Sequence, residues 1–148
     1  MSANMNAATS TYGRTYNPAF DATVLLIGRL LVAALFIVFG YMKLTSFGGT
    51  VAYFTKWGFP VPQATTVVAI IFELGFGLLL ALGWKTRWWA WLLALYTVIA
   101  AAVAHRYWTY EPAQVFAQTS FFYKNLAIVG GLLYIAVFGP GRYSVDKS

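Results

Sequence analysis

The sequence contains no cysteine among its 148 residues. This chain therefore cannot form a disulfide within itself, use a thiolate nucleophile, or hold an iron–sulfur cluster through its own cysteines. It has one histidine, His105, which excludes a haem held by two histidines of the same chain. The whole chain has only four acidic residues in addition to this histidine, so we expect no metal site and no intrinsic cofactor.

Charge is also scarce, whereas apolar residues are abundant. Only 9% of the residues are charged, against about 25% in soluble domains, and 60% are hydrophobic. A helix needs about 20 residues to cross about 30 Å of hydrocarbon. Four stretches meet or approach this length, so the sequence predicts an all-α integral membrane bundle of four transmembrane helices. The expected spans are residues 22–42, 64–83, 88–105 and 121–138.

The chain divides into a central membrane domain and two short ends. Residues 1–19 are mostly small and polar, and we expect them to form a flexible tail. The membrane domain is predicted over residues 20–142, and residues 143–148 form a C-terminal tail. The first apolar stretch is longer than the core of a secretory signal and contains Arg29, so we expect it to be retained as the first span.

Four spans place both ends of the chain on one side of the membrane, which we call the terminal side, opposite the loop side. Slightly more basic residues lie on the terminal side, so we predict that both termini are cytoplasmic. The net charge of +6 is spread over helix ends and loops instead of one face. We therefore expect a lipid bilayer, and no nucleic acid, as the partner.

The first loop on the loop side is not simply polar. Val51, Phe54 and Trp57 recur at helical spacing between residues 45 and 63. This pattern is typical of a short helix that lies in the membrane interface. We therefore predict a short interfacial segment before the second span.

Arg29 and Glu73 are the only charged residues inside long apolar stretches. An isolated charge at mid-membrane costs roughly 2.5–3.5 kcal/mol on insertion scales. Glu73 belongs to a stripe with Ala69, Gly77 and Ala81, and small residues at this spacing let helices approach closely. Counting the rise per residue puts the two charges within about 5 Å in depth. We predict an intramembrane Arg29–Glu73 ion pair, which either fixes the packing of the helices or relays protons.

Other polar residues gather near the loop-side boundary. His105 ends the third span, about 12 Å further toward the loop side than Glu73. Lys43 closes the first span, Lys124 and Asn125 begin the fourth, and Glu111 lies in the loop between. Together these groups form a candidate ligand-binding site for a quinone carbonyl or a small anion, with His105 able to exchange a proton. The alternative is that the lysines reach toward lipid headgroups and His105 simply ends a helix.

Several short motifs occur in a fixed order along the chain. After Arg29 come GYMKL at 40–44, GFPVP at 58–62, ELGFG at 73–77, LGWKTR at 82–87, then His105, Lys124–Asn125 and GPGRYSVD at 139–146. This ordered set resembles the DoxX family over residues 22–146. The resemblance implies a small four-helix inner-membrane protein, and the family name is linked to a thiosulfate:quinone oxidoreductase. Its typical polar positions correspond here to Arg29, Lys43, Glu73, His105, Lys124 and Asn125.

Three functional hypotheses follow from these observations. The first is a membrane subunit of a quinone-linked oxidoreductase or respiratory complex, which receives its electrons from a partner subunit. The second is a non-catalytic accessory or assembly subunit of a larger membrane complex. The third is a small-solute or proton pathway through the bundle. Whether the chain is an enzyme stays open, and its small-residue helix faces suggest that it forms a homo-oligomer.

Overall fold

The computed structural model describes residues 18–146 as a helical membrane protein. Its elements are α1 (Pro18–Thr45), α2 (Phe47–Lys56), α3 (Pro62–Ile70), the π-helix η1 (Ile71–Phe76), α4 (Gly77–Leu82), α5 (Thr86–Ala104), the 3₁₀-helix η2 (Tyr107–Thr109) and α6 (Pro112–Phe138). Four helices are long and apolar enough to cross a membrane, with α3, η1 and α4 forming one of them. The predicted all-α bundle of four membrane helices is confirmed. Residues 1–17, which hold most of the predicted N-terminal tail, lie outside the described residues.

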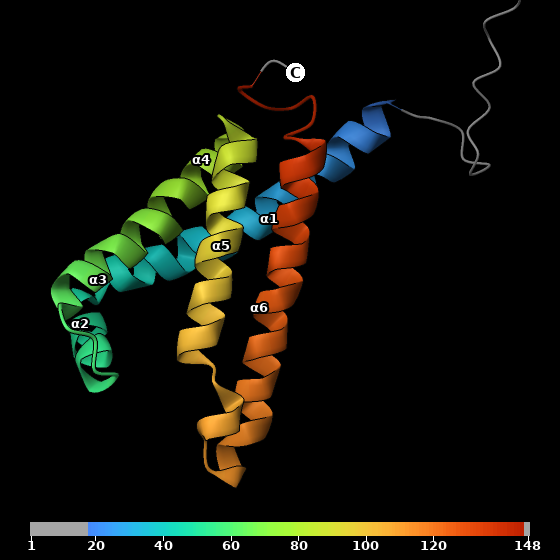
Figure 1. The fold of residues 1–148 in the computed structure, drawn as a ribbon. Helices are drawn as coiled ribbons and strands as arrows, with labels where there is room; N and C mark the ends of the chain where they lie inside the picture. The colour runs from blue at the N-terminus through green and yellow to red at the C-terminus, as the bar shows by residue number, and fades with distance from the viewer. Residues whose placement is uncertain (1–17, 147–148) are drawn as a thin grey trace, which may run out of the picture.

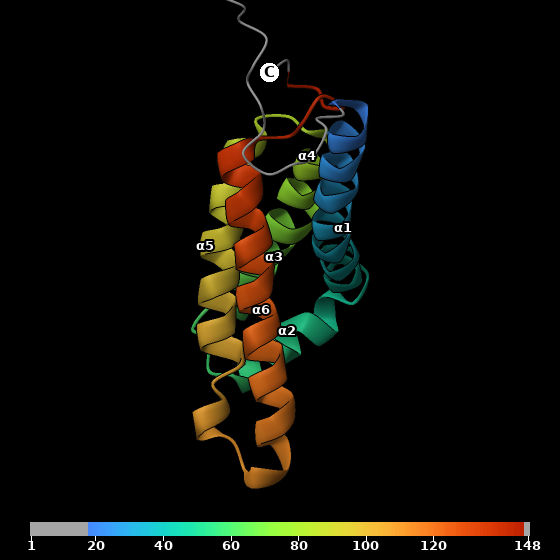
Figure 2. The ribbon, with the colours of Figure 1, turned by 90° about the vertical axis from the view of Figure 1, so that its right-hand side faces the viewer.

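The helices pack as two pairs. α1 packs along the continuous α3–η1–α4 helix, which it crosses obliquely, and α5 packs along α6 (Figure 1). The two pairs are close near the termini and diverge toward the other end, where α2 lies (Figures 1 and 2). Both ends of the described chain lie at the same end of the bundle, as an even number of spans requires. We call this the terminal end and the opposite one the loop end.

The four membrane helices overlap the four predicted spans, and the largest difference in bounds is at the start of the fourth helix. α6 begins at Pro112, nine residues before the predicted start at residue 121. Proline is favoured in the first turn of a helix because its missing N–H is not needed there. The first turns of α6 contain Gln114 and Gln118, so hydropathy does not mark them as part of a span. Lys124 therefore lies well inside the helix and does not open it.

The segment after α1 forms the short helix that the spacing of its apolar residues predicts. α2 covers Phe47–Lys56, and Val51, Phe54 and Trp57 are all half-buried. Gly58 then turns the chain with a φ of +74°, a conformation that glycine adopts without strain. That α2 lies in the membrane interface stays a prediction.

Glycine allows the first pair of helices to cross at close range. A Cβ added at Gly40 would lie closer than 3.0 Å to the backbone of Leu74, and one at Gly77 would lie 3.0 Å from Cβ of Phe36. Ala69, Glu73 and Gly77 are all buried, so the small-residue stripe does face the bundle. This close crossing brings the loop end of α1 beside the middle of η1.

Arg29 and Asp146 hold the segment after α6 against the terminal end, and Arg87 binds the end of α6 itself. Arg29 donates hydrogen bonds to the carbonyls of Pro140 and, at 2.6 Å, of Tyr143. Arg87 donates to the last turn of α6, at 2.5 Å from the carbonyl of Val137. Asp146 accepts hydrogen bonds at the start of α5. The described part of the predicted C-terminal tail, residues 143–146, therefore packs on the bundle.

The Asp146 carboxylate should make stability depend on acid pH. It accepts hydrogen bonds from the N–H groups of Lys85 at 2.8 Å and Thr86 at 2.9 Å. Desolvation opposes its charged form, but these bonds and the charge of Arg29 outweigh it and lower the pKa of Asp146. Because the pKa is lower in the folded than in the unfolded state, the stabilisation is complete above about pH 4 and is lost as pH falls through the folded value.

We therefore expect Asp146→Asn to lower the unfolding temperature in detergent near neutral pH. The loss relative to wild type should shrink as the pH falls below about 4, and it should disappear only below the lowered pKa of folded Asp146, where the wild-type carboxylate is protonated as well. Glu111→Gln, at an exposed carboxylate, serves as the control and should follow wild type. Parallel curves for Asp146→Asn and wild type across this pH range would contradict the assignment.

Candidate functional site

Glu73 lies in the only π-helical element among residues 18–146, in the middle of the second membrane helix. η1 covers Ile71–Phe76, between the regular α-helical turns of α3 and α4. Such π-helical turns occur frequently at functional sites. No sequence signal predicts this turn, although it lies where η1 and α1 are in close contact through Gly40.

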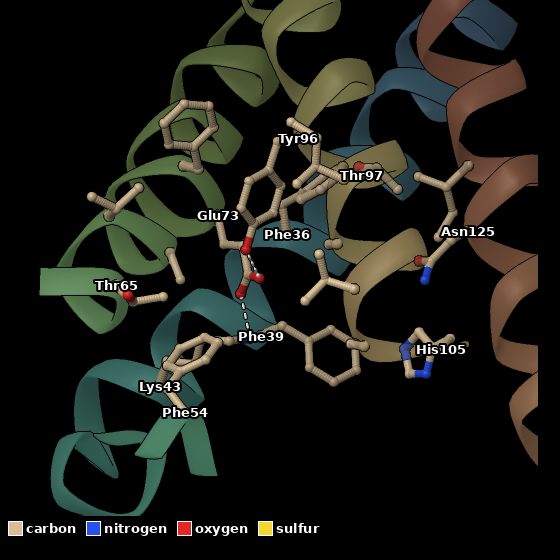
Figure 3. A pocket seen from close by; sticks show the side chains of 18 of the residues that line it. Phe36, Phe39, Lys43, Phe54, Thr65, Glu73, Tyr96, Thr97, His105 and Asn125 are labelled. Atoms are coloured by element: carbon tan, nitrogen blue, oxygen red, sulfur yellow. Dashed lines mark hydrogen bonds and ion pairs between the residues drawn. The ribbon is translucent and has the colours of Figure 1, made fainter. Parts of the chain in front are cut away.

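The Glu73 carboxylate is buried and bound on both oxygens. Lys43 Nζ lies 2.6 Å from Oε2, and the Tyr96 hydroxyl donates to Oε1 at 2.6 Å (Figure 3). Glu73 is only 8% exposed. A lysine and a phenol, on α1 and α5, thus hold one carboxylate on η1. The charged pair and the hydrogen bond link three membrane helices.

The predicted Arg29–Glu73 ion pair is wrong. The Arg29 guanidinium binds the carbonyls of Pro140 and Tyr143 at the terminal end, and the partner of Glu73 is Lys43. The depth count treated the helices as parallel to the membrane normal, whereas α1 crosses the second helix obliquely (Figure 1). It also ignored the segment after α6, whose carbonyls satisfy Arg29.

One cavity of about 830 Å³, which we call the main cavity, lies between the two helix pairs. Its polar lining comprises Lys43, Thr65, Glu73, Tyr96, Thr97, His105, Lys124 and Asn125. Its apolar lining includes Phe36, Phe39, Phe54, Trp57, Phe59, Phe72 and Phe121. In Figure 3, Glu73 with Lys43 and Tyr96 lies on one side, and His105 and Asn125 lie on the other.

The structure thus brings four of the five candidate ligand-binding residues, Lys43, His105, Lys124 and Asn125, to one cavity. Glu111, the fifth, does not line this cavity and lies exposed just before α6. Glu73 lines the same cavity, whereas the depth count had separated it from the cluster. The predicted cluster and the intramembrane carboxylate are therefore parts of a single site.

His105 is positioned by groups of α6. Its Nδ1 lies 2.8 Å from Oε1 of Gln118, and its ring centroid lies 5.3 Å from that of Phe121. Lys124 lies over the same Phe121 ring, 5.7 Å from its centroid. These contacts hold an imidazole and an ammonium group at one wall of the main cavity.

Tyr96 and Gln118 are site residues that sequence reasoning missed. Tyr96 stacks on Phe72 with centroids 5.1 Å apart, which orients its hydroxyl toward Glu73. A phenol within an apolar helix resembles an ordinary core aromatic, so composition alone gives no signal. Gln118 precedes the apolar part of α6, so it lies outside the predicted fourth span. Within residues 18–146 no three histidine or acidic side chains gather as a metal site requires.

The comparisons with known proteins agree with this architecture. The DoxX family model matches residues 24–106. The inner membrane protein YphA of Escherichia coli is 37% identical over 124 residues, covering 84% of this chain and 89% of that protein. The inner membrane protein YqjF of Escherichia coli is 35% identical over 122 residues, covering 82% and 88%.

A more distant relative is the yeast ER-derived vesicles protein ERV29, which is 30% identical over 124 residues but is covered for only 33% of its length. No solved structure matches significantly. The family match covers more than half of the chain, and the two bacterial relatives are covered almost completely. The chain belongs to the DoxX family and is a multi-pass inner membrane protein.

Proposed function

We propose that this protein is a membrane subunit of a quinone-linked oxidoreductase and that the main cavity binds the quinone head group. The observation that carries this proposal is the combination of an aromatic cavity of about 830 Å³ with hydrogen-bonding groups on two opposite walls. Small-molecule sites are typically apolar clefts of about 300–1,000 Å³ with a few placed polar groups. The main cavity fits this description.

The chemistry of a quinone matches the two polar walls. A quinone is flat and apolar, and its two carbonyl oxygens accept hydrogen bonds on opposite edges of the ring. Lys43 carries three N–H donors and uses one on Glu73, so others are free for a carbonyl. On the facing wall, Asn125 and Lys124 offer further donors. Aromatic side chains such as Phe39 and Phe72 provide flat surfaces for the ring between them.

Electrons must come from a partner in this proposal, because the chain has no cysteine for an iron–sulfur cluster and only one histidine. The names of the bacterial relatives give a location, the inner membrane, and no activity. An accessory subunit without catalytic function would also occupy this membrane, and binding experiments separate the two hypotheses. The proposal includes cytoplasmic termini, which place the loop end on the opposite side of the membrane.

We expect purified protein in detergent to bind a short-chain quinone and to lose tryptophan fluorescence as it does, because Trp57 lines the main cavity. Lys124→Met should weaken binding about tenfold, which corresponds to the loss of one charge-assisted hydrogen bond of about 1.4 kcal/mol. Titration of fluorescence against quinone concentration gives both dissociation constants.

Lys85→Met is the matched control, because Lys85 precedes α5 at the terminal end, away from the main cavity. It should bind quinone like wild type. Saturable binding that is equal in wild type, Lys124→Met and Lys43→Met would contradict the site. Absence of quinone binding to a folded protein would instead favour the accessory subunit.

A further inference from the structure

A second cavity adjoins the main cavity at the loop end of the bundle. It has a volume of about 410 Å³, and we call it the loop-end cavity. Its lining residues are Tyr53, Lys56, Trp57, Ala104, His105, Tyr110, Gln114 and Gln118. Tyr53, Trp57, Ala104 and His105 also line the main cavity. The two cavities therefore share a wall, and His105 is the one histidine in it.

The linings of the two cavities differ in chemistry. The main cavity is formed mostly by aromatic and aliphatic side chains of the membrane helices. In the loop-end cavity, Lys56, Gln114 and Gln118 contribute a cation and two amides. These residues belong to α2 and to the first turns of α6, outside the apolar stretches of the chain. A roomy cavity with several polar partners holds water, so we expect this one to be wet.

The hydrogen bond to Gln118 fixes where the neutral His105 ring carries its proton. Nδ1 of His105 lies 2.8 Å from the amide oxygen of Gln118, which can only accept. The ring proton therefore lies on Nδ1, and Nε2 is left as an acceptor. Among residues 18–146, no hydrogen bond to Nε2 is formed. An imidazole with one nitrogen bonded and the other open can take up and release a proton at the open nitrogen.

We propose that His105 transfers protons between water in the loop-end cavity and the main cavity, where Glu73 is the acceptor. Uptake of a proton at Nε2 from water in the loop-end cavity gives the imidazolium, whose Nδ1–H stays bonded to Gln118, and loss of the same Nε2 proton to water in the main cavity restores the neutral ring. One proton thus crosses the shared wall and reaches the Glu73 carboxylate through water in the main cavity. The titratable groups around His105 are Tyr53 and Lys56 from α2, Tyr110 from the loop, and Lys124 from α6, with Lys43 and Glu73 across the main cavity.

The proton route has a use only if the proposed function is correct, because a quinone that gains electrons in the main cavity also gains protons. The proton route itself can be tested without quinone. In proteoliposomes subjected to a rapid acid jump, infrared spectroscopy follows protonation of the Glu73 carboxyl, whose band is identified by its absence in Glu73→Gln. His105→Ala should slow this protonation on the order of a hundredfold, the usual contribution of a positioned acid or base. Added imidazole should restore much of the rate.

His105→Gln keeps a polar side chain and should be slow as well, without rescue by imidazole. Wild-type rates in either variant would overturn the proposal, and so would failure of imidazole to accelerate folded His105→Ala. Quinone binding to both variants is measured separately, by fluorescence titration. Because the proton route is followed without quinone, its loss is a separate result from a change in quinone binding, and either proposal can fail alone.

A second test measures whether the loop-end cavity contains water. Because the chain has no cysteine of its own, a single introduced cysteine is the only thiol that can be labelled. A single cysteine at Gln118 in the loop-end cavity should react rapidly with a charged, membrane-impermeant thiol reagent. A cysteine at Val98, which is 42% exposed and lines neither cavity, should stay unmodified in the bilayer. Equal and negligible labelling at both positions would mean that the loop-end cavity is dry, which would overturn the proton route.

Discussion

Replacing Lys43 with methionine is expected to destabilise the protein by about 3 kcal/mol. The substitution leaves the Glu73 carboxylate buried with only the Tyr96 hydroxyl as a partner. Removing one member of a buried ion pair typically costs about 3–5 kcal/mol, because the remaining charge is uncompensated. We take the lower end because the side chain of Lys43 is 24% exposed, so that water reaches this end of the pair. Unfolding by denaturing detergent, followed by circular dichroism, measures the loss.

The double variant Lys43→Met with Glu73→Gln should recover most of this stability, because both charges are then gone. A double-mutant cycle isolates the interaction as the difference between the double variant and the sum of the single variants. Lys124→Met is the control, because Lys124 lines the same cavity but is not paired with a carboxylate among residues 18–146. The free energy of unfolding of this variant should stay within about 0.5 kcal/mol of wild type. Additive losses in the cycle would contradict the Lys43–Glu73 pair.

The second large effect is expected for Arg29→Met. Arg29 is 2% exposed and binds the carbonyls of Pro140 and Tyr143. Hydrogen bonds from charged donors contribute about 1.5–3 kcal/mol each, so the loss of both should destabilise the protein by about 3–6 kcal/mol. The segment after α6 should also separate from the bundle. Limited trypsin digestion then measures its release as faster cleavage after Arg142.

Arg106→Met provides a matched control for Arg29, because Arg106 is an exposed arginine of the loop end. It should leave stability and cleavage after Arg142 unchanged. The charge swap Arg29→Glu with Glu73→Arg should be at least as unstable as either single variant, since the two residues have different partners. Restored stability in the swap would contradict the separate roles given to Arg29 and Glu73.

The helices were predictable from sequence because a membrane imposes a strong requirement on length and apolarity. Four apolar stretches gave the spans, and the spacing of Val51, Phe54 and Trp57 gave α2. The start of α6 was not predictable in this way, because its first turns carry glutamines outside the apolar stretch. Hydropathy marks the part of a helix that prefers hydrocarbon, and the hydrogen-bonded helix continues beyond it.

The members of the site were largely predictable, but their pairing was not. Charged residues inside apolar stretches are costly, which singled out Arg29 and Glu73, whereas His105 and Lys124 were singled out because they gather at the loop-side boundary. Pairing depends on how the helices cross, and the close contact of Gly40 with Leu74 sets this crossing. A depth count along separate helices contains no crossing angle. The depth count therefore predicted Arg29 as the partner of Glu73, whereas the partner in the structure is Lys43.

The central claim is that Glu73, Lys43 and His105 line one cavity that binds a quinone, and photo-crosslinking tests it most directly. A photoreactive short-chain quinone, bound to the protein in proteoliposomes, is activated by light, and the modified residues are mapped by mass spectrometry. We predict modification at main-cavity residues such as Phe39, Phe72 and Phe121, suppressed by excess unlabelled quinone and reduced in Lys124→Met. Modification confined to lipid-facing residues such as Tyr134, or unaffected by competing quinone, would contradict the claim.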